Sequence, residues 1–200
     1  MAIRYGASAL GFVSAMPSGP GPISEDLIAE IIPRVPPGIL TFLLTSKQDA
    51  LSIIGQQRRT EANTLQLVDT VSFETYHELR TSLPGVSIVQ VIHVRGSDAI
   101  ESATSISPFV DALLLDSGNP NLAVKQLGGT GRVHDWAISK AICTRVTIPV
   151  YLAGGLNPEN VAEAIRLVRP FGVDLCSGVR TDHALDEEKI SRFFDQVATA

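Results

Sequence analysis

The 200-residue sequence has few cysteines, few aromatic residues, no long apolar run and no large excess of either charge. Its two cysteines, Cys143 and Cys176, have no CxxC or other paired spacing, which argues against a disulfide framework or a cysteine-based zinc site. No apolar run approaches the roughly 20 residues of a membrane helix, and residues 1–6 lack the apolar core of a signal peptide. We therefore predict a cytoplasmic protein without a membrane partner.

The charge balance bears on the type of partner. The formal net charge is −5, and no block of basic residues interrupts the chain. A nucleic-acid-binding surface needs clustered lysine and arginine, so we expect no nucleic-acid partner. Any anion site must then be local and made from backbone N–H groups or single arginines.

The length and the 44% hydrophobic content are typical of one globular domain, here residues 1–200. Strand-like apolar runs alternate with helix-like segments, which predicts an α/β fold with a parallel sheet. The seven predicted strands are residues 9–14, 39–45, 64–68, 87–94, 112–116, 150–153 and 173–176. Residues 2–5 resemble the last turn of a helix capped by Gly6, and the predicted helices are 25–32, 48–57, 72–83, 98–105, 134–143, 158–168 and 186–197.

A glycine-rich stretch, Gly128-Gly129-Thr130-Gly131, lies between the fifth strand and the following helix. Glycine has no Cβ atom to keep a ligand away from the backbone, so this loop can bring N–H groups close to a bound molecule. Asp135 follows at the start of the helix and adds a carboxylate. The pattern favours acid–base chemistry on a phosphorylated or oxygen-rich small molecule, although a plain surface loop has the same composition.

Small residues follow the last two predicted strands. Residues 150–153 lead into Gly154-Gly155-Leu156-Asn157-Pro158, where Asn157 is expected to cap a helix beginning at the proline. Residues 173–176 lead into Ser177-Gly178. Ligands of parallel α/β folds bind beyond the carboxyl ends of the strands, and a helix N-terminus favours an anion. Each glycine alone also fits a tight turn, but together they predict a phosphate site made by Gly154, Gly155, Asn157, Ser177 and Gly178.

Four ordered motifs carry a resemblance to a known family. They are Leu114-Leu115-Asp116-Ser117, the glycine loop followed by Asp135-Trp136, the stretch LAGGLNPENV at 152–161, and Val173-Asp174 followed by Ser177-Gly178-Val179. They resemble phosphoribosylanthranilate isomerase of tryptophan biosynthesis, densely over residues 89–194 and more weakly over 6–13 and 65–67. The resemblance implies a (β/α)8 barrel of the TIM-barrel type. It also implies an Amadori rearrangement of N-(5'-phosphoribosyl)anthranilate to 1-(2-carboxyphenylamino)-1-deoxyribulose 5-phosphate, a phosphorylated small-molecule substrate, and no cofactor.

The resemblance also implies roles for individual residues. Asp135 is the general acid that protonates the ribose ring oxygen as the ring opens. The loop Gly129-Thr130-Gly131 closes over the sugar, and the phosphate lies against the N–H groups near Gly154, Gly155, Ser177 and Gly178. To hold a proton near neutral pH, the carboxyl of Asp135 needs desolvation or a nearby negative charge. Trp136 is a candidate for this apolar shielding, although a plain core position is the commoner role for a tryptophan.

The sequence departs from the family pattern at three points. The family base is a cysteine at the end of the first strand, but this chain begins within what resembles the first helix, so we expect an N-terminally incomplete barrel. The loop at 18–22 lacks the arginine that holds the anthranilate carboxylate. Gln66-Leu67-Val68-Asp69 stands where the family has Gln-Leu-His-Gly. Two hypotheses remain: an isomerase of doubtful activity, or a non-catalytic phosphosugar-binding barrel derived from that family.

Other residues are weaker candidates. Cys176 is a surrogate base because its strand neighbours the missing one, although a buried, inert thiol is the commoner role. Arg95 follows a strand and is either an anion contact or simply a solvated side chain, and Asp116 is a candidate ligand or helix cap. His93 and His134 have no metal-ligand spacing, so we expect no metal.

An eight-stranded barrel has no sheet edges, but loss of its first strand creates two. Residues 9–14 and 173–176 would then face a gap with unpaired backbone groups. We expect an open, C-shaped or self-associating barrel, with homo-oligomer formation through these edges. A tight seven-stranded barrel is less favourable because tilt and stagger depend on strand number.

Overall fold

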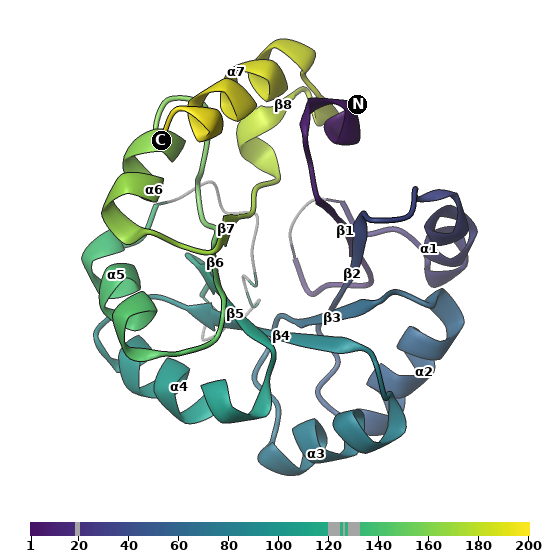
Figure 1. Cartoon of the computed structure of the whole chain (residues 1–200). Helices are drawn as coiled ribbons and strands as arrows, with labels where there is room; N and C mark the ends of the chain where they lie inside the picture. The colour runs from purple at the N-terminus through teal and green to yellow at the C-terminus, as the bar shows by residue number, and fades with distance from the viewer. Residues whose placement is uncertain (19–20, 120–124, 126, 128–132) are drawn as a thin grey trace.

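The computed structural model describes residues 1–18, 21–119, 125, 127 and 133–200, and strands alternate with helices through these ranges (Figure 1). Seven parallel strands form one curled sheet in chain order. They are β1 (Ala9–Val13), β2 (Leu40–Thr45), β3 (Thr64–Leu67), β4 (Ser87–His93), β5 (Ala112–Asp116), β6 (Val150–Leu152) and β7 (Gly172–Val173). The outer helices are α1 (Glu25–Ile31), α2 (Ala50–Thr60), α3 (Phe73–Ser82), α4 (Asp98–Ile106), α5 (Trp136–Arg145), α6 (Val161–Val168) and α7 (Glu187–Ala198). Short 3-10 helices are η1 (Ala2–Tyr5), η2 (Ile32–Arg34), η3 (Ser107–Phe109) and η4 (Ser177–Val179).

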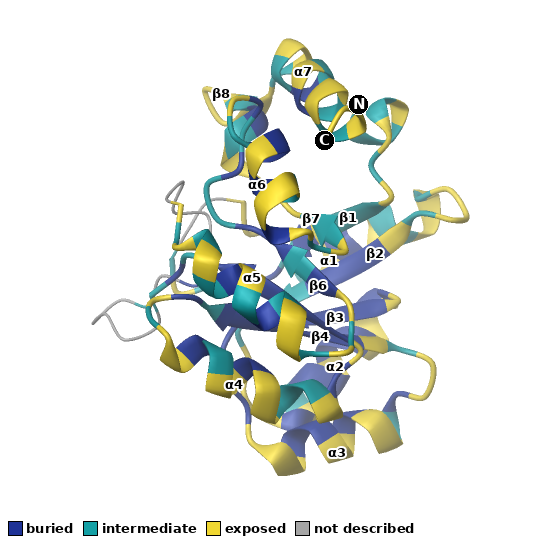
Figure 2. Cartoon of the chain, turned by 60° about the vertical axis from the view of Figure 1, so that its left-hand side comes forward, coloured by how far each residue is buried: buried dark blue, intermediate teal, exposed yellow. Residues whose placement is uncertain are grey.

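Strands β2 to β5 are largely buried on both faces, whereas the edge strands β1 and β7 are mostly half-buried, and the exposed residues lie mainly on the helices and loops around the sheet (Figure 2). Every residue of β5 is buried, as expected for a central parallel strand. Because successive side chains of a strand point in opposite directions, Leu113 and Leu115 join the core beneath the helices, whereas Leu114 joins a smaller cluster inside the barrel. In that inner cluster Phe42 and Tyr151 meet edge to face, with ring centroids 6.1 Å apart. Side chains from distant strands therefore fill the interior.

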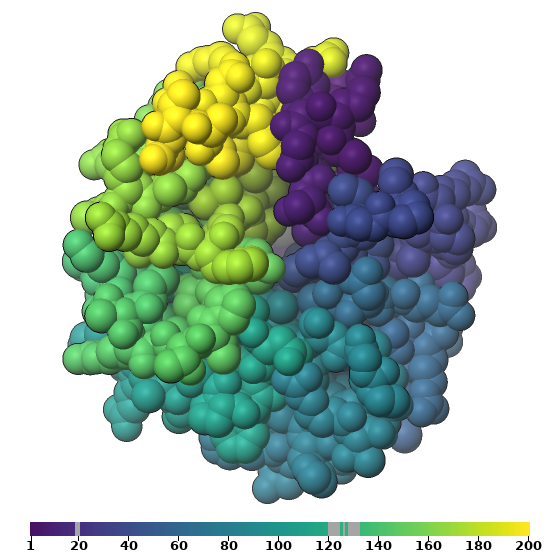
Figure 3. Space-filling view, viewed as in Figure 1, coloured from purple at the N-terminus to yellow at the C-terminus, as the bar shows by residue number. Residues whose placement is uncertain are grey.

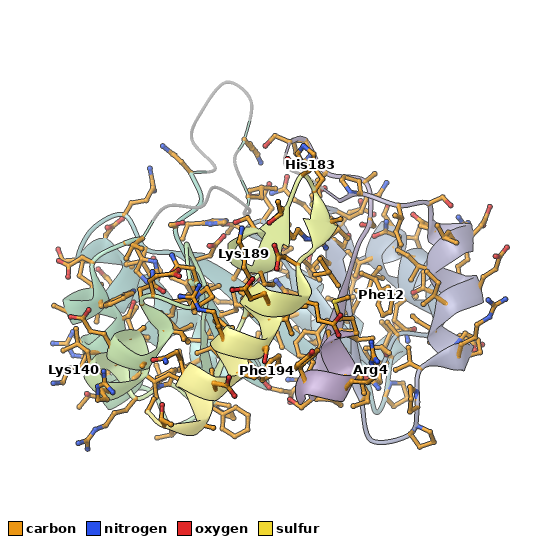
Figure 4. The ribbon with its side chains drawn as sticks, turned by 90° about the horizontal axis from the view of Figure 1, so that it is seen from above. Arg4, Phe12, Lys140, His183, Lys189 and Phe194 are labelled. Atoms are coloured by element: carbon orange, nitrogen blue, oxygen red, sulfur yellow. The ribbon has the colours of Figure 1, made fainter. Side chains whose placement is uncertain are left out.

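The curled sheet remains open in the described part of the chain, because β1 and β7 each pair with one neighbour and not with each other. The outer layer, by contrast, closes around this opening. The Tyr5 hydroxyl donates to Glu187 Oε1 over 3.0 Å, and an Arg4 nitrogen lies 3.7 Å from the same oxygen. A Cβ atom at Gly6 would lie 3.5 Å from the ring of Phe194. Figures 3 and 4 show the N-terminal residues directly beside α7. The prediction of an open barrel is confirmed.

Most helices begin at a side-chain cap whose oxygen accepts a hydrogen bond from the first turn, which satisfies an otherwise unpaired N–H group. The capping residues are Ser24, Asp49, Ser72, Asp135 and Asp186. Four of them correct the predicted boundaries. The helices expected to begin at residues 48, 72, 134 and 186 begin at Ala50, Phe73, Trp136 and Glu187, because Asp49, Ser72, Asp135 and Asp186 are the caps.

The predicted strand at 173–176 is wrong in its extent. β7 contains only Gly172 and Val173, and the Asp174 N–H adds one further bond to the Leu152 carbonyl over 2.9 Å. The strand is short because it pairs on one side only and its neighbour β6 is itself three residues long. Cys176 therefore lies in the loop beyond the strand.

The helix predicted from Pro158 is also displaced. The side-chain oxygen of Asn157 accepts from the backbone N–H groups of Glu159 and Asn160, over 2.9 and 3.1 Å, so it caps a separate turn. α6 then begins at Val161. The predicted helix start and cap belong to this turn.

A short antiparallel hairpin, β8 (Arg180–Thr181) and β9 (Ala184–Leu185), has no counterpart among the predicted elements. Its turn residues, Asp182 and His183, have φ angles of 49° and 65°. Both are left-handed without a glycine, so the usual signal for a two-residue hairpin turn is absent from the sequence.

Candidate active site

The predicted site residues lie on segments that leave the carboxyl ends of the strands, which meet at one mouth of the barrel. Two of these segments, the connection between β5 and α5 and the loop after β6, come together at Gly154. A Cβ atom at this glycine would lie 3.0 Å from the Ser117 backbone nitrogen and 3.0 Å from His134 Nδ1. The segment that carries Asp135 therefore reaches the loop after β6, as a shared site requires.

Asp135, the predicted general acid, is the N-cap of α5. Its Oδ1 accepts from the Ala137 N–H over 2.9 Å, and the side chain is exposed. The cap fixes the place of the carboxylate, but the described residues do not desolvate it. Trp136 is half-buried and packs against the main core, which is the contact of a core residue.

The predicted sugar loop, Gly129, Thr130 and Gly131, lies outside the described residues. Closure of this loop over the sugar therefore stays a prediction, and so does the role of Asp135 as the acid.

The loop after β6 is shaped by its own hydrogen bonds. Gly154 and Gly155 have φ angles of 83° and 67°, which favour glycine. The Asn157 N–H donates to Asn160 Oδ1 over 2.9 Å, and Asn160 Nδ2 donates to the Gly155 carbonyl over 3.0 Å. The N–H group of Asn157 is thus already used within the loop. Asn157 shapes the predicted phosphate site, and its own N–H is not free for an anion.

The loops after β6 and β7 pack backbone against backbone. A Cβ atom at Gly178 would lie 1.9 Å from the Leu156 carbonyl oxygen and 3.1 Å from the Asn157 Cα. Only glycine permits this approach. The short helix η4 begins at Ser177 directly beside this contact. The structure therefore brings together the two segments that the sequence assigns to one phosphate site.

Cys176 is exposed and lies immediately before η4, three residues beyond the end of β7. The expectation of a buried, inert thiol is wrong for this residue. Its role as a surrogate base stays a prediction. Cys143 is half-buried on α5, and burial raises the pKa of its thiol.

Two carboxylates at the mouth, Asp116 and Asp174, lie close enough for their charges to interact. Of the two, the sequence names only Asp116 as a candidate, either for a ligand or for a helix cap. Asp116 is buried at the end of β5, and burial raises its pKa against the opposing effect of a hydrogen bond from the Ser117 backbone. Asp174 is exposed to solvent at the edge of the sheet, although many protein atoms lie near its carboxyl group. Desolvation, and then the negative charge of Asp116, raise the pKa of Asp174 to about 6.

The two-residue period of the strands could have predicted this pair. Leu114 faces the barrel interior, so Asp116 does as well. A Cβ atom at Gly172 would lie 2.9 Å from the ring of Tyr151 in the same interior, so Asp174, two residues later, faces it too.

The other polar residues at the mouth have structural partners. His93 Nε2 lies 2.9 Å from the Val68 carbonyl oxygen, and desolvation lowers the pKa of the imidazole. Asp69 is buried and forms an ion pair with Lys125. An Arg95 nitrogen donates to Asn119 Oδ1 over 3.4 Å. Each of these contacts orders a segment leaving the sheet.

Two further properties concern the described part of the chain alone. In it, no group of three or more His, Cys, Asp or Glu side chains is placed to hold a metal ion. No helix there is both long and apolar enough to cross a membrane. The prediction that no cofactor is needed stays a prediction.

The model of the N-(5'-phosphoribosyl)anthranilate (PRA) isomerase family matches residues 44–196 of the chain. The protein N-(5'-phosphoribosyl)anthranilate isomerase 2 of Methanosarcina mazei is 38% identical over 195 residues, which cover 96% of this chain and 85% of that protein. This chain belongs to the PRA isomerase family. The predicted family and enzyme class, an isomerase of tryptophan biosynthesis, are confirmed by these relatives.

Solved PRA isomerases have the same fold. The Thermotoga maritima enzyme, described as dimeric, superposes with a TM-score of 0.83 at 28% identity, covering 100% of this chain and 92% of its own. A PRA isomerase in complex with reduced 1-(o-carboxyphenylamino)-1-deoxyribulose 5-phosphate superposes with a TM-score of 0.80 at 26% identity, covering 100% and 91%. The predicted TIM-barrel type is confirmed, with seven strands in the curled sheet.

Proposed function

We propose that this chain binds N-(5'-phosphoribosyl)anthranilate at the mouth of its barrel and acts on it as a PRA isomerase. The observation that carries the proposal is the backbone contact between Gly178 and Leu156. It joins the loops after β6 and β7, the last two strands of the sheet. The loops after the last two strands of a barrel commonly bind a substrate phosphate with the help of a short extra helix. In this proposal η4 takes the part of that helix.

Backbone N–H groups hold the phosphate in this proposal. Those of Gly154, Gly155, Ser177 and Gly178 belong to the two joined loops, and N–H groups at a helix start favour an anion. A local site of this kind suits a chain whose net charge is −5. Asn157 contributes by holding the loop in shape through its bonds to Glu159 and Asn160.

Asp135 is the proposed general acid. Its proton passes to the ribose ring oxygen as the bond between that oxygen and C1 breaks, and the amine nitrogen forms an iminium ion with C1. A base then removes the C2 proton, and the electron pair forms the enol that becomes the ketose. The carboxyl needs desolvation to carry its proton near neutral pH. In this proposal, Gly129, Thr130 and Gly131 supply it by closing over the sugar.

The proposed base is Cys176, the exposed thiol before η4. We propose that turnover is slow, because Cys176 lies three residues beyond the end of β7 and not at a strand end. A positioned acid or base typically contributes about 10²–10⁴-fold to the rate. A non-catalytic phosphosugar-binding barrel is the second candidate, and the similarity to isomerases along 96% of the chain favours the enzyme.

Calorimetry with the reduced deoxyribulose phosphate and a fluorescence assay of turnover test this proposal together. Wild type should bind the analogue and turn over the substrate slowly. Asp135→Asn and Cys176→Ser should each retain binding and lose turnover, whereas Asp26→Asn, at an exposed position on α1, should change neither. Binding without any turnover would favour the non-catalytic barrel. Absence of binding to folded protein would sink the phosphate site.

Location and partners complete the proposal. We place the protein in the cytoplasm, without a cofactor or nucleic-acid partner, and expect self-association through the open edges of β1 and β7. Light scattering across a range of concentrations tests the last point. A monomer at every concentration would contradict it.

A further inference from the structure

His134 is the residue immediately before the proposed general acid, and its imidazole is fixed at one nitrogen. Nε2 lies 2.7 Å from the hydroxyl oxygen of Ser139, which is fully buried in the first turns of α5. This contact spans the start of the helix, from the residue before the cap to the fourth residue within it. The orientation of the ring is thereby tied to α5.

The other nitrogen faces a different segment. Nδ1 is buried and has no hydrogen-bond partner among the described residues. It lies 3.0 Å from the point where a Cβ atom of residue 154 would stand, and the Ser117 hydroxyl oxygen lies 3.1 Å from the same point. The imidazole therefore occupies the space that Gly154 leaves open, between the end of β5 and the loop after β6.

We infer that His134 is a positioning residue for Asp135, because it holds the start of α5 against the Gly154 loop and so fixes the carboxylate relative to the ligand phosphate. This inference rests on the proposed function. The Asp135 backbone is bonded to His134, and its Oδ1 caps the Ala137 N–H. Any shift of the imidazole is passed to the carboxylate through these two connections.

The ring is suited to this task because it stays neutral. Desolvation lowers the pKa of His134 to about 4, so the side chain is uncharged at physiological pH. A neutral imidazole offers one donor and one acceptor, and a serine hydroxyl can bond to either. A phenylalanine would fill the same space without the bond to Ser139, so it could turn within the site.

Substitution of His134 by glutamine or asparagine distinguishes a positioning role from a role in which the side chain only fills space. The side-chain amide of glutamine reaches the place of Nε2, and that of asparagine reaches only the place of Nδ1. His134→Gln should therefore keep the bond to Ser139, whereas His134→Asn and Ser139→Ala should lose it. His77→Asn and Ser102→Ala are matched controls, since both residues are exposed on other helices.

Amide hydrogen exchange with and without inorganic phosphate is the decisive measurement, and the Ala137 N–H reports directly on Asp135. Without phosphate, exchange at Ala137 should be about fivefold or more faster in His134→Asn and Ser139→Ala, as expected for loss of a hydrogen bond. His134→Gln and both controls should match wild type. Phosphate should slow exchange at Ala137 in wild type and His134→Gln but not in His134→Asn, although Gly155 and Ser177 remain protected. Turnover should follow the same order through kcat, with little change in KM.

Equal exchange at Ala137 in wild type and His134→Asn, or no recovery in His134→Gln, would overturn the inference. Phosphate that protects neither Gly155 nor Ser177 in wild type would instead refute the proposed phosphate site. In that case the ligand-free exchange rates still decide whether His134 positions Asp135.

Discussion

The half-buried imidazole of His134 should make the protein sensitive to acid in a defined pH window. Desolvation lowers the pKa of His134 to about 4, against the opposing effect of the nearby Asp135 charge, from an ordinary value of 6.5. Below pH 6.5 the unfolded chain takes up a proton that the folded protein takes up only near pH 4. The contribution of the neutral His134 side chain to the free energy of unfolding is therefore complete above pH 6.5, and it is lost as the pH falls from 6.5 to about 4.

The size of the effect follows from the two pKa values. Each pH unit between them changes the free energy of unfolding by 1.36 kcal/mol, so the full window corresponds to about 3 kcal/mol. Solvent reaches part of the side chain, which makes this an upper value. The effect is a large fraction of the total stability of a typical domain, about 5–15 kcal/mol.

Urea unfolding of wild type and His134→Phe between pH 4 and pH 7.5 measures this contribution. The free energy of unfolding of wild type, relative to the variant, should rise by up to about 3 kcal/mol between pH 4 and pH 6.5. Taking the difference between wild type and the variant cancels the contributions of other titrating groups. One of these is Asp174, whose raised pKa makes the free energy of unfolding fall as the pH rises. His77→Phe, at an exposed site, is the control. A difference that stays constant across the window would refute the reasoning.

Three further predictions concern single contacts. Gly178→Ala should abolish binding of the reduced product analogue in calorimetry and destabilise the fold by about 1–3 kcal/mol, because the new methyl group would stand 1.9 Å from the Leu156 carbonyl oxygen. Unchanged affinity would contradict the claim that the two joined loops form the phosphate site. Asp135→Ala should lower the free energy of unfolding by about 1 kcal/mol through loss of the α5 cap, whereas Asp135→Asn should not, and equal losses in urea titrations would contradict a role as cap. Tyr76→Phe should cost about 1–3 kcal/mol, because the buried Gln90 Oε1 loses the hydroxyl that donates to it over 2.6 Å, and an unchanged denaturation midpoint would disprove that contribution.

The strands and helices follow mostly from local sequence, because their signals lie within a few residues of one another. The run Leu113-Leu114-Leu115 predicts a strand buried on both faces, and β5 is buried throughout. Ser24 predicts a helix start, and its hydroxyl accepts from the Leu27 N–H. A strand end is predicted wrongly where the local sequence competes with pairing. The apolar Leu175 and Cys176 extend the predicted strand beyond Asp174, but β7 lacks a neighbour on one side and ends at Val173.

The segments of the candidate site can also be predicted from the sequence, since each motif follows a strand and parallel strands end at one mouth. The glycines at 154, 155 and 178 mark loops in which the backbone lies close to a ligand or to another part of the chain. The local sequence does not identify that neighbouring group. In the tertiary structure the neighbour of Gly178 is the Leu156 carbonyl, and the neighbour of Gly154 is the imidazole of His134.

By itself the sequence determined a parallel α/β chain of the PRA isomerase family, the acid at Asp135 as a candidate, and the loops expected to bind phosphate. The tertiary structure alone decided that Asp174 lies close enough to Asp116 for their charges to interact, and that Cys176 is exposed. It also decided that η1 meets α7 outside an open sheet. The physical reason is the same in each case. Desolvation, charge coupling and close packing depend on groups that are distant along the chain, and only folding sets the distances between them.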